Sequence, residues 1–352
     1  MYLDHHLNIL QEEMLVQKKS AENMNAAIKD KRDTQLQNKR EEFSEKVKSD
    51  NKMIFEEEKV IVDQKRSDPV AGKATITLTY GDQAGIHRGM QKLGKVASTG
   101  LSVQDLEDAR IKFEAKGCKC EIINLNDALS GTNKTGDKAA VLIARKAMDL
   151  LDQNLSADKL FDEQMKLKWD DKAFMYGKVV NKHARSNLSY GEEAQEPHYE
   201  KNKATVVAFK SIPCTSLVRK LLGDYFGEKG KNLMCDGFLY NDVSKCGLGF
   251  HGDTERKKVI AVRLGAPLAL HFQWFCNLEP VGKTVKLMLN HGDIYVMSEK
   301  ATGYDWRSKK AVTLRHAAGC EKFLVIEEKK AKPSSKKKGK KNGDSEGGDS
   351  DD

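Results

Sequence analysis

His251, Gly252 and Asp253 are the residues of this chain whose types and spacing best suit chemistry. On a β-strand, residues two apart point to the same face, so an imidazole nitrogen and a carboxylate oxygen would lie side by side. Gly252 avoids crowding between them. One imidazole and one carboxylate are two members of a facial triad, which leaves metal positions open for substrate and oxygen. We therefore predict a metal site at His251 and Asp253.

Two further side chains fit a pocket that binds a carboxylate. Arg315 follows the strand-like run at 311–314. An arginine inside a β-structure keeps its charge and needs an anionic partner, which a dicarboxylate would supply through two parallel hydrogen bonds. Tyr240 lies on the strand-like run that precedes His251, and its hydroxyl is a possible donor to the same ligand. The alternative for Arg315 is an ordinary surface ion pair.

Residues 176–319 contain a series of short motifs: Tyr176-Gly177, Phe238-Leu239-Tyr240, HGDTER at 251–256, RLG at 263–265, LNHGD at 289–293 with the IYVM that follows, and TLR at 313–315. In order and spacing, these motifs resemble the AlkB-type branch of the Fe(II)/2-oxoglutarate dioxygenases. The resemblance implies a double-stranded β-helix (jelly roll), Fe(II) held by two histidines and one aspartate, and 2-oxoglutarate held by a tyrosine and an arginine. It also implies oxidation of alkyl groups on nucleobases or, in some branches, of other substrates.

The third metal ligand is the point at which the chain departs from this family. The distal histidine would fall within residues 300–307, which contain no histidine. We predict that Asp305 replaces it, because it lies 52 residues after Asp253, near the expected position, and a carboxylate is a competent oxygen ligand. His316 and His291 are the alternatives. His316 is adjacent to Arg315, and on one regular strand the two would face opposite sides.

The remaining predicted contacts are also carried over from the resemblance. Lys309 stands where the family has the first of two late arginines, so it joins Tyr240 and Arg315 as a predicted 2-oxoglutarate contact. Lys182 and Arg185 occupy the region of the family's substrate lid and are expected to meet phosphates, with a polar loop as the alternative. Glu255 and Arg256 follow the metal pair, and they are expected to contact substrate or each other.

The sequence predicts an α+β protein with two domains and two extensions. Residues 1–68 contain no Gly and no Pro and predict a long polar helix, either paired with another helix as a coiled coil or solvated. Residues 70–153 alternate strands with helices and predict a small α/β domain. The run at 75–80 alternates with period two and predicts a strand, and a capping box at Ser102 opens a helix. Many short strands at 157–328 predict the jelly-roll domain. The tail at 329–352, basic and then acidic, is predicted to be disordered.

Composition limits the compartment and the partners. The seven cysteines are scattered and odd in number, which indicates reduced thiols inside a cell, in the nucleus or cytoplasm. No apolar run reaches the length of a membrane span. The net charge of +8 permits nucleic-acid binding without requiring it. The predicted function is a 2-oxoglutarate-dependent dioxygenase that uses Fe(II) on alkylated nucleobases. The alternatives are the same chemistry on protein or small molecules, or an inactive binding module.

Overall fold

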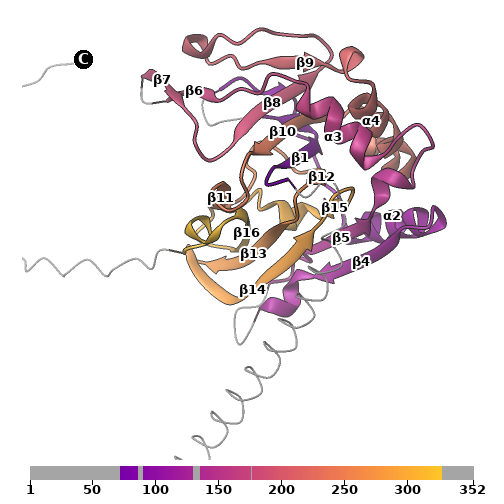
Figure 1. Ribbon diagram of the computed structural model, residues 1–352. Coiled ribbons are helices and arrows are strands. Elements are labelled where there is room, and N and C mark those ends of the chain that lie inside the picture. The colour runs from indigo at the N-terminus through magenta and orange to yellow at the C-terminus, as the bar shows by residue number, and fades with distance from the viewer. Residues whose placement is uncertain (1–71, 86–89, 130–134, 176, 327–352) are drawn as a thin grey trace, which may run out of the picture. The chain divides into compact units, whose positions relative to one another are not determined.

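Strands in sheets, with a few helices, make up the described part of the chain, which is a mixed α+β protein (Figure 1). The predicted helix at 1–68 and the predicted tail at 329–352 lie outside the described residues. No helix of the described part is long and apolar enough to cross a membrane. The residues described in this computed structural model are 72–85, 90–129, 135–175 and 177–326.

The larger sheet has eight strands in the order β4-β5-β15-β12-β1-β10-β8-β9. All neighbours are antiparallel except β8 and β9, which are parallel. β1 pairs with both β10 and β12, although these strands lie far from it in the chain. The strands are β1 (Thr75–Gly81), β4 (Lys119–Asn124), β5 (Ala140–Arg145), β8 (Ser186–Gly191), β9 (Val206–Ala208), β10 (Met234–Tyr240), β12 (Val259–Gly265) and β15 (Ile294–Met297).

The smaller sheet has four strands in the order β11-β16-β13-β14. Its strands are β11 (Gly247–His251), β13 (Leu268–Cys276), β14 (Glu279–Leu289) and β16 (Val312–Gly319). Two short hairpins complete the strands: β2 (Gln83–Ala84) with β3 (Leu93–Gly94), and β6 (Lys172–Met175) with β7 (Lys178–Asn181).

In the described residues, three α-helices and several short 3₁₀-helices connect the strands. The α-helices are α2 (Val103–Ala115), α3 (Ala157–Met165) and α4 (Pro213–Phe226). The capping box predicted at Ser102 is confirmed: its hydroxyl accepts from the backbone N–H of Asp105, whose carboxylate accepts from the backbone N–H of Ser102. The 3₁₀-helices are η2 (Leu125–Ala128), η3 (Ala147–Asp149), η4 (Tyr199–Lys201), η5 (Phe209–Ser211), η6 (Gly227–Gly230), η7 (Glu299–Thr302) and η8 (Glu321–Phe323).

β1 is buried on both faces, and its sequence TITLTYG alternates accordingly. Ile76, Leu78 and Tyr80 point into the hydrophobic core on the helical side of the sheet. Thr77 and Thr79 point the other way and line a cavity between the two sheets. Because the side chains of a strand alternate between its faces, one strand supplies both an apolar and a hydroxyl-bearing surface.

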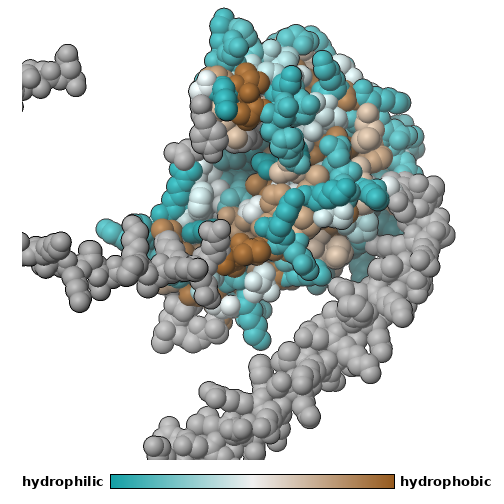
Figure 2. All heavy atoms as spheres, turned by 60° about the vertical axis from the view of Figure 1, so that its left-hand side comes forward, coloured by the Kyte–Doolittle hydropathy of each residue, from teal (hydrophilic) through white to brown (hydrophobic). Residues whose placement is uncertain are grey.

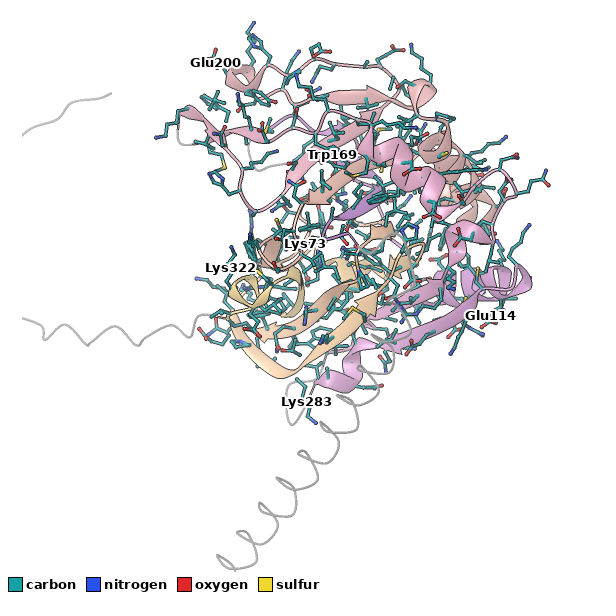
Figure 3. All side chains as sticks on the ribbon, in the orientation of Figure 1. Lys73, Glu114, Trp169, Glu200, Lys283 and Lys322 are labelled. Atoms are coloured by element: carbon teal, nitrogen blue, oxygen red, sulfur yellow. The ribbon has the colours of Figure 1, made fainter. Side chains whose placement is uncertain are left out.

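Two hydrophobic cores lie on opposite faces of the larger sheet. The first packs the sheet against helices, through residues such as Leu106 of α2 and Leu222 of α4. The second packs it against the smaller sheet, through residues such as Val259 of β12 and Phe272 of β13. The layers are therefore helices, larger sheet and smaller sheet (Figure 1). Figure 3 shows side chains filling the space between these layers, while Glu114 extends outward.

The boundary predicted between residues 70–153 and 157–328 does not hold. β1, β4 and β5 belong to the first range and β10, β12 and β15 to the second, yet they share one sheet. The described residues fall in one compact unit. The local alternation of strands and helices indicated a separate α/β domain, because pairing between distant strands leaves no local signal in the sequence.

The surface that carries β6, β7 and β11 is largely hydrophilic. Figure 2 brings this side of the molecule forward and shows hydrophobic residues in small separate groups among hydrophilic ones. Single exposed hydrophobic residues are normal on a folded protein and need no partner to explain them.

Leu78→Ala tests whether β1 unfolds together with the smaller sheet. Leu78 is fully buried, so its truncation should lower the free energy of unfolding by about 2–5 kcal/mol. All three tryptophans lie within the range predicted as the second domain. Urea unfolding followed by their fluorescence should therefore show one transition, moved as a whole to lower urea. Ile111→Ala is the control because Ile111 is 59% exposed. If Leu78→Ala leaves the urea midpoint of the tryptophan fluorescence transition unchanged, β1 and the smaller sheet do not unfold as one unit.

Candidate metal centre

His251 and His316 face each other across the pair β11 and β16. The register of this antiparallel pair places the two residues directly opposite. Their ring centroids are 4.4 Å apart, and the ring planes meet at 62°. Residues directly opposite each other in an antiparallel pair present their side chains on the same face. The strand pairing alone therefore brings two imidazoles together.

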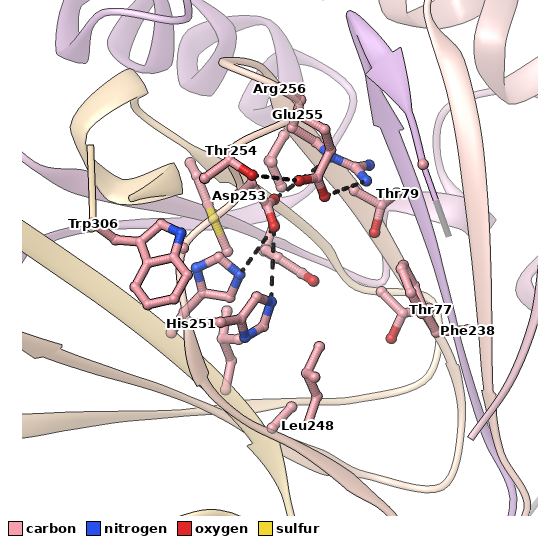
Figure 4. A pocket seen from close by; sticks show the side chains of 18 of the residues that line it. Thr77, Thr79, Phe238, Leu248, His251, Asp253, Thr254, Glu255, Arg256 and Trp306 are labelled. Carbon is pink, nitrogen blue, oxygen red and sulfur yellow. Dashed lines mark hydrogen bonds and ion pairs between the residues drawn. The ribbon is translucent and has the colours of Figure 1, made fainter. Parts of the chain in front are cut away.

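Asp253 follows β11 and completes a cluster of three possible metal ligands. Its Oδ1 lies 3.7 Å from Nε2 of His251 and 3.8 Å from Nε2 of His316. The possible ligand atoms of the three residues all lie within 4.8 Å of one another. Figure 4 shows the carboxylate next to both imidazole rings, with Trp306 on one side of them. Two imidazoles and one carboxylate form the donor set of a facial triad.

The loop that holds Asp253 packs closely on the turn after η7. A Cβ atom at Gly252 would lie 2.1 Å from the carbonyl oxygen of Gly303 and 2.6 Å from Cδ1 of Trp306. The backbone N–H of Asp253 donates to the carbonyl of Thr302 at 2.9 Å. Only glycine fits at position 252 without displacing this turn, so the spacing of the two ligands depends on a residue without a side chain.

Both imidazoles can offer the lone pair of a ring nitrogen to a metal. Nδ1 of His251 lies 2.8 Å from the carbonyl oxygen of Gly249. A carbonyl only accepts, so this nitrogen carries the proton and Nε2 is left free for a metal. Burial lowers the pKa of His251, against the opposing effect of Asp253. Burial lowers the pKa of His316 well below its usual value, with His251 and Arg256 acting in the same direction.

Asp305, predicted as the third metal ligand, is not part of the cluster. Its carboxylate accepts a hydrogen bond from Nζ of Lys300 at 2.8 Å, and it lines a different pocket. His291 is also elsewhere, because its Nδ1 accepts from the backbone N–H of Gly265 at 2.8 Å. The prediction of Asp305 is wrong, and the structure places His316, one of the two alternatives, beside His251 and Asp253.

Arg315, predicted to bind the co-substrate, faces away from the cluster. Its neighbour His316 points inward, so Arg315 points to the outer face of β16, as alternation requires. Its guanidinium carbon lies 3.8 Å from the centroid of the Phe275 ring, and it lines an outer groove. Lys309 is exposed and does not line the cavity. The structure thus contradicts both predicted co-substrate cations, whereas Tyr240 does line the cavity.

The cluster lines a cavity of about 400 Å³ between the two sheets. Of the four predicted substrate contacts, Arg185, Glu255 and Arg256 also line this cavity. Lys182 does not line it, and its Nζ donates instead to Oδ1 of Asn187 at 3.1 Å. Burial lowers the pKa of Lys182 to about 8. This lysine is half-buried and bonded to Asn187, so it lies apart from the cavity lining.

Arg256 forms a buried ion pair behind the cluster. Its Nη2 lies 2.6 Å from Oδ2 of Asp236, and the two side chains are 2% and 0% exposed. Asp236 also accepts hydrogen bonds from Ser189 and from the backbone N–H of Gly85. Nε of Arg256 lies 3.7 Å from Oδ2 of Asp253. Arg256 therefore lies between the Asp253 carboxylate and the buried Asp236 and can hold the former in position.

Arg263 is a cavity residue to which the sequence analysis gave no role of its own. It is 1% exposed on β12 and lines the cavity with Thr77. Its Nε and Nη1 have no hydrogen-bond partner among the described residues. The signal in the sequence was an arginine within VIAVRLG, a strand that is otherwise apolar and buried. A charged residue in such a run indicates either a buried ion pair or a ligand site.

His316→Ala and Asp305→Ala separate the observed third ligand from the predicted one. Loss of one of three protein ligands should weaken Mn(II) or Fe(II) binding by about a hundredfold, since each ligand supplies a large share of the affinity. We therefore expect weak binding by His316→Ala and unchanged binding by Asp305→Ala in calorimetric titrations of the metal-free protein. The opposite pattern would exclude the cluster of His251, Asp253 and His316 as the metal site.

Arg256→Met should destabilise the protein strongly, because it leaves the Asp236 carboxylate buried without its cation. The expected loss is about 3–5 kcal/mol in the free energy of unfolding, measured in urea. Arg110→Met is the matched control, since Arg110 pairs with Glu107 and Glu114 on the exposed face of α2. That substitution should cost less than about 1 kcal/mol. Equal effects of the two substitutions would contradict the assignment of a structural ion pair.

Comparison with known proteins relates the chain to a viral protein. No protein-family model matches this chain. Over 253 residues, it is 44% identical to uncharacterized protein R156 of Acanthamoeba polyphaga mimivirus. The match covers 98% of the viral protein and 72% of this chain. Identity at this level over nearly the whole of a relative requires a common fold, and the chain therefore belongs to the same family as this mimivirus protein.

Proposed function

We propose that this protein is an Fe(II)/2-oxoglutarate-dependent dioxygenase. The observation that carries the proposal is the cluster of His251, Asp253 and His316 in the wall of a cavity. Its donor set of two imidazoles and one carboxylate is typical of non-haem Fe(II) oxygenases and leaves coordination positions open. The neutral imidazoles and the buried setting support metal binding by these three residues.

We further propose that the two sheets form a jelly roll, the double-stranded β-helix of these oxygenases. In support, the smaller sheet packs on β1, β10, β12 and β15 through a common core, with the cavity between them. The strand between β10 and β12 is β1, from the start of the described chain. β1 therefore fills the position between β10 and β12 in the larger sheet, so that sheet lines the cavity without a further strand after β16.

The protein residues have distinct roles in the proposed reaction. His251, Asp253 and His316 would hold Fe(II), which supplies the activation of O₂ when bound. The carbonyl of Gly249 fixes the tautomer of His251, and Arg256 keeps the Asp253 carboxylate in place. The overall reaction balances when 2-oxoglutarate, O₂ and a substrate C–H give succinate, CO₂ and a substrate C–OH.

An alkylated nucleobase is the substrate class that we propose. Phe238 and Trp306 offer aromatic surfaces within the cavity wall, and aromatic side chains stack on unpaired bases. Arg185 lies over the Phe238 ring at 5.6 Å and Arg307 over the Trp306 ring at 5.1 Å. Both arginines line the cavity with Lys92, so cations are available for the phosphates next to a base.

Succinate formation tests the proposed chemistry. The protein loaded with Fe(II) in the absence of oxygen should produce succinate once 2-oxoglutarate and O₂ are added. His316→Ala should lose this activity by about a hundredfold or more, because it removes a metal ligand. Asp305→Ala is the matched control and should keep it. A wild-type protein that binds iron but forms no succinate would contradict the enzyme and favour a binding module.

Methylated oligonucleotides test the proposed substrate class. Oxidation of a methylated base, together with affinity that falls as salt rises, is the expected result. If the protein does not bind DNA or RNA even at low salt but still forms succinate, nucleic acid is rejected as its substrate. That outcome would leave the alternative of a protein or small-molecule substrate.

A further inference from the structure

Arg263 carries a buried positive charge that no described residue neutralises. Its side chain is 1% exposed, and Nε and Nη1 have no hydrogen-bond partner among the described residues. Arginine does not lose its proton in a protein, and a buried unpaired charge is costly. Arg256, in the same cavity wall, differs because Asp236 pairs with it at 2.6 Å. The unpaired donors of Arg263 therefore favour binding of an anion that is not among the described residues.

Thr77 lies directly beside Arg263 on the neighbouring strand. The register of β1 and β12 pairs the two residues, and both line the cavity. Oγ1 of Thr77 is also buried without a hydrogen-bond partner in the described part of the chain. In Figure 4, Thr77 and Trp306 lie on opposite sides of the histidine rings. Two residues on paired strands, each with an unsatisfied polar atom, thus line one cavity.

Tyr295 of β15 adds a third possible donor to this part of the wall. It is 5% exposed and lines the cavity, one strand away from Arg263. Burial raises the pKa of Tyr295 to about 12, while the positive charge of Arg263 acts in the opposite direction. The phenol therefore keeps its proton at neutral pH and can donate a hydrogen bond.

We infer that Arg263 and Thr77 form the binding site for the distal carboxylate of a dicarboxylate co-substrate. The inference rests on the proposed function, in which the 2-oxo acid end of the same molecule meets the cluster of His251, Asp253 and His316. A planar guanidinium binds a carboxylate through two parallel hydrogen bonds, here from Nη2 together with Nε or with Nη1, and the hydroxyl of Thr77 supplies another. The anchoring arginine then lies on β12 of the larger sheet, not on β16, where Arg315 was predicted to bind.

Arg185, like Arg307, is a cavity arginine without an ion pair in the described residues. It is less deeply buried than Arg263 and lies over the ring of Phe238 at 5.6 Å. Its place near an aromatic surface suits the main substrate better than the co-substrate. Arg185→Met is for this reason the matched control for Arg263→Met, since both remove one arginine from the same cavity.

The test compares two 2-oxo acids that differ only at the distal end. Calorimetry would measure 2-oxoglutarate and 2-oxopentanoate binding to protein loaded with Mn(II), which does not support turnover. We expect Arg263→Met to weaken 2-oxoglutarate binding by about a hundredfold, the effect of removing one partner of a buried charge pair. Affinity for 2-oxopentanoate should stay unchanged. Thr77→Val should weaken the binding of 2-oxoglutarate about fivefold. Arg185→Met should leave the preference for 2-oxoglutarate over 2-oxopentanoate unchanged.

Thermal unfolding without ligand distinguishes a binding residue from a structural one. A structural arginine stabilises the protein, so its removal would lower the melting temperature, as expected for Arg256→Met. Arg263→Met removes an unpaired buried charge, so the melting temperature should stay the same or rise. Added 2-oxoglutarate should raise the melting temperature of the wild type and not of Arg263→Met.

Each remaining outcome decides between the inference and the function on which it rests. Equal affinity of the wild type and Arg263→Met for 2-oxoglutarate would overturn the inference and leave the proposed function in place. A wild type that binds Mn(II) but not 2-oxoglutarate would overturn the proposed function. Titration with succinate then decides on the anion site alone: binding that depends on Arg263 supports it, and no binding overturns it.

Discussion

The pairing of β11 with β16 is the interaction on which the candidate site depends. It sets His251 opposite His316, and Asp253 follows within reach of both imidazoles. Because side chains along a strand alternate between its two faces, the direction of the side chain at position 315 is then fixed. If His316 faces the cavity, Arg315 must face outward, where it lies over the ring of Phe275. One register therefore decides both which residue completes the cluster and which arginine is excluded from it.

β1 is the second constraint, because it supplies the wall opposite the smaller sheet. It lies between β10 and β12 and is buried on both faces. A strand in this position needs apolar side chains toward the helices, and it can carry hydroxyl groups only toward a polar cavity. The sequence TITLTYG meets both needs. The chain thus brings a segment before Gly81 into the same cavity as residues beyond 250, and the cavity belongs to the fold as a whole.

Sequence reasoning identified what depends on local pattern. The strand at 75–80, the capping box at Ser102 and the inward pair His251 and Asp253 all follow from spacing within a few residues, and each has its counterpart in the structure. The third ligand did not follow, because Asp305 was chosen by its distance along the chain. Distance along the chain does not specify how a loop folds back, and Lys300 holds the Asp305 carboxylate elsewhere.

Alternation along β16 allows only one of Arg315 and His316 to face the cavity, and Arg315 was predicted to be that residue. In the structure it is His316. A second arginine in the cavity would have removed the need for that choice. Arg263 was visible as the single charge within VIAVRLG, but nothing local tells whether such a charge pairs with a protein carboxylate or with a ligand. Only the long-range pairing of β12 with β1 and β15 answers that question.

The charges around the cavity favour a dianion over a neutral or singly charged co-substrate. Arg256 is neutralised by Asp236, so it contributes no net charge. A divalent metal held by one carboxylate and two neutral imidazoles would keep one positive charge, and Arg263 would add a second at a separate point of the wall. Arg185, Arg307 and Lys92 also line the cavity, but we assign them to the phosphates of the main substrate. A buried charge is tolerated when it is paired. A molecule with a carboxylate at each end neutralises both positions at once, whereas a monoanion would leave one of them unpaired.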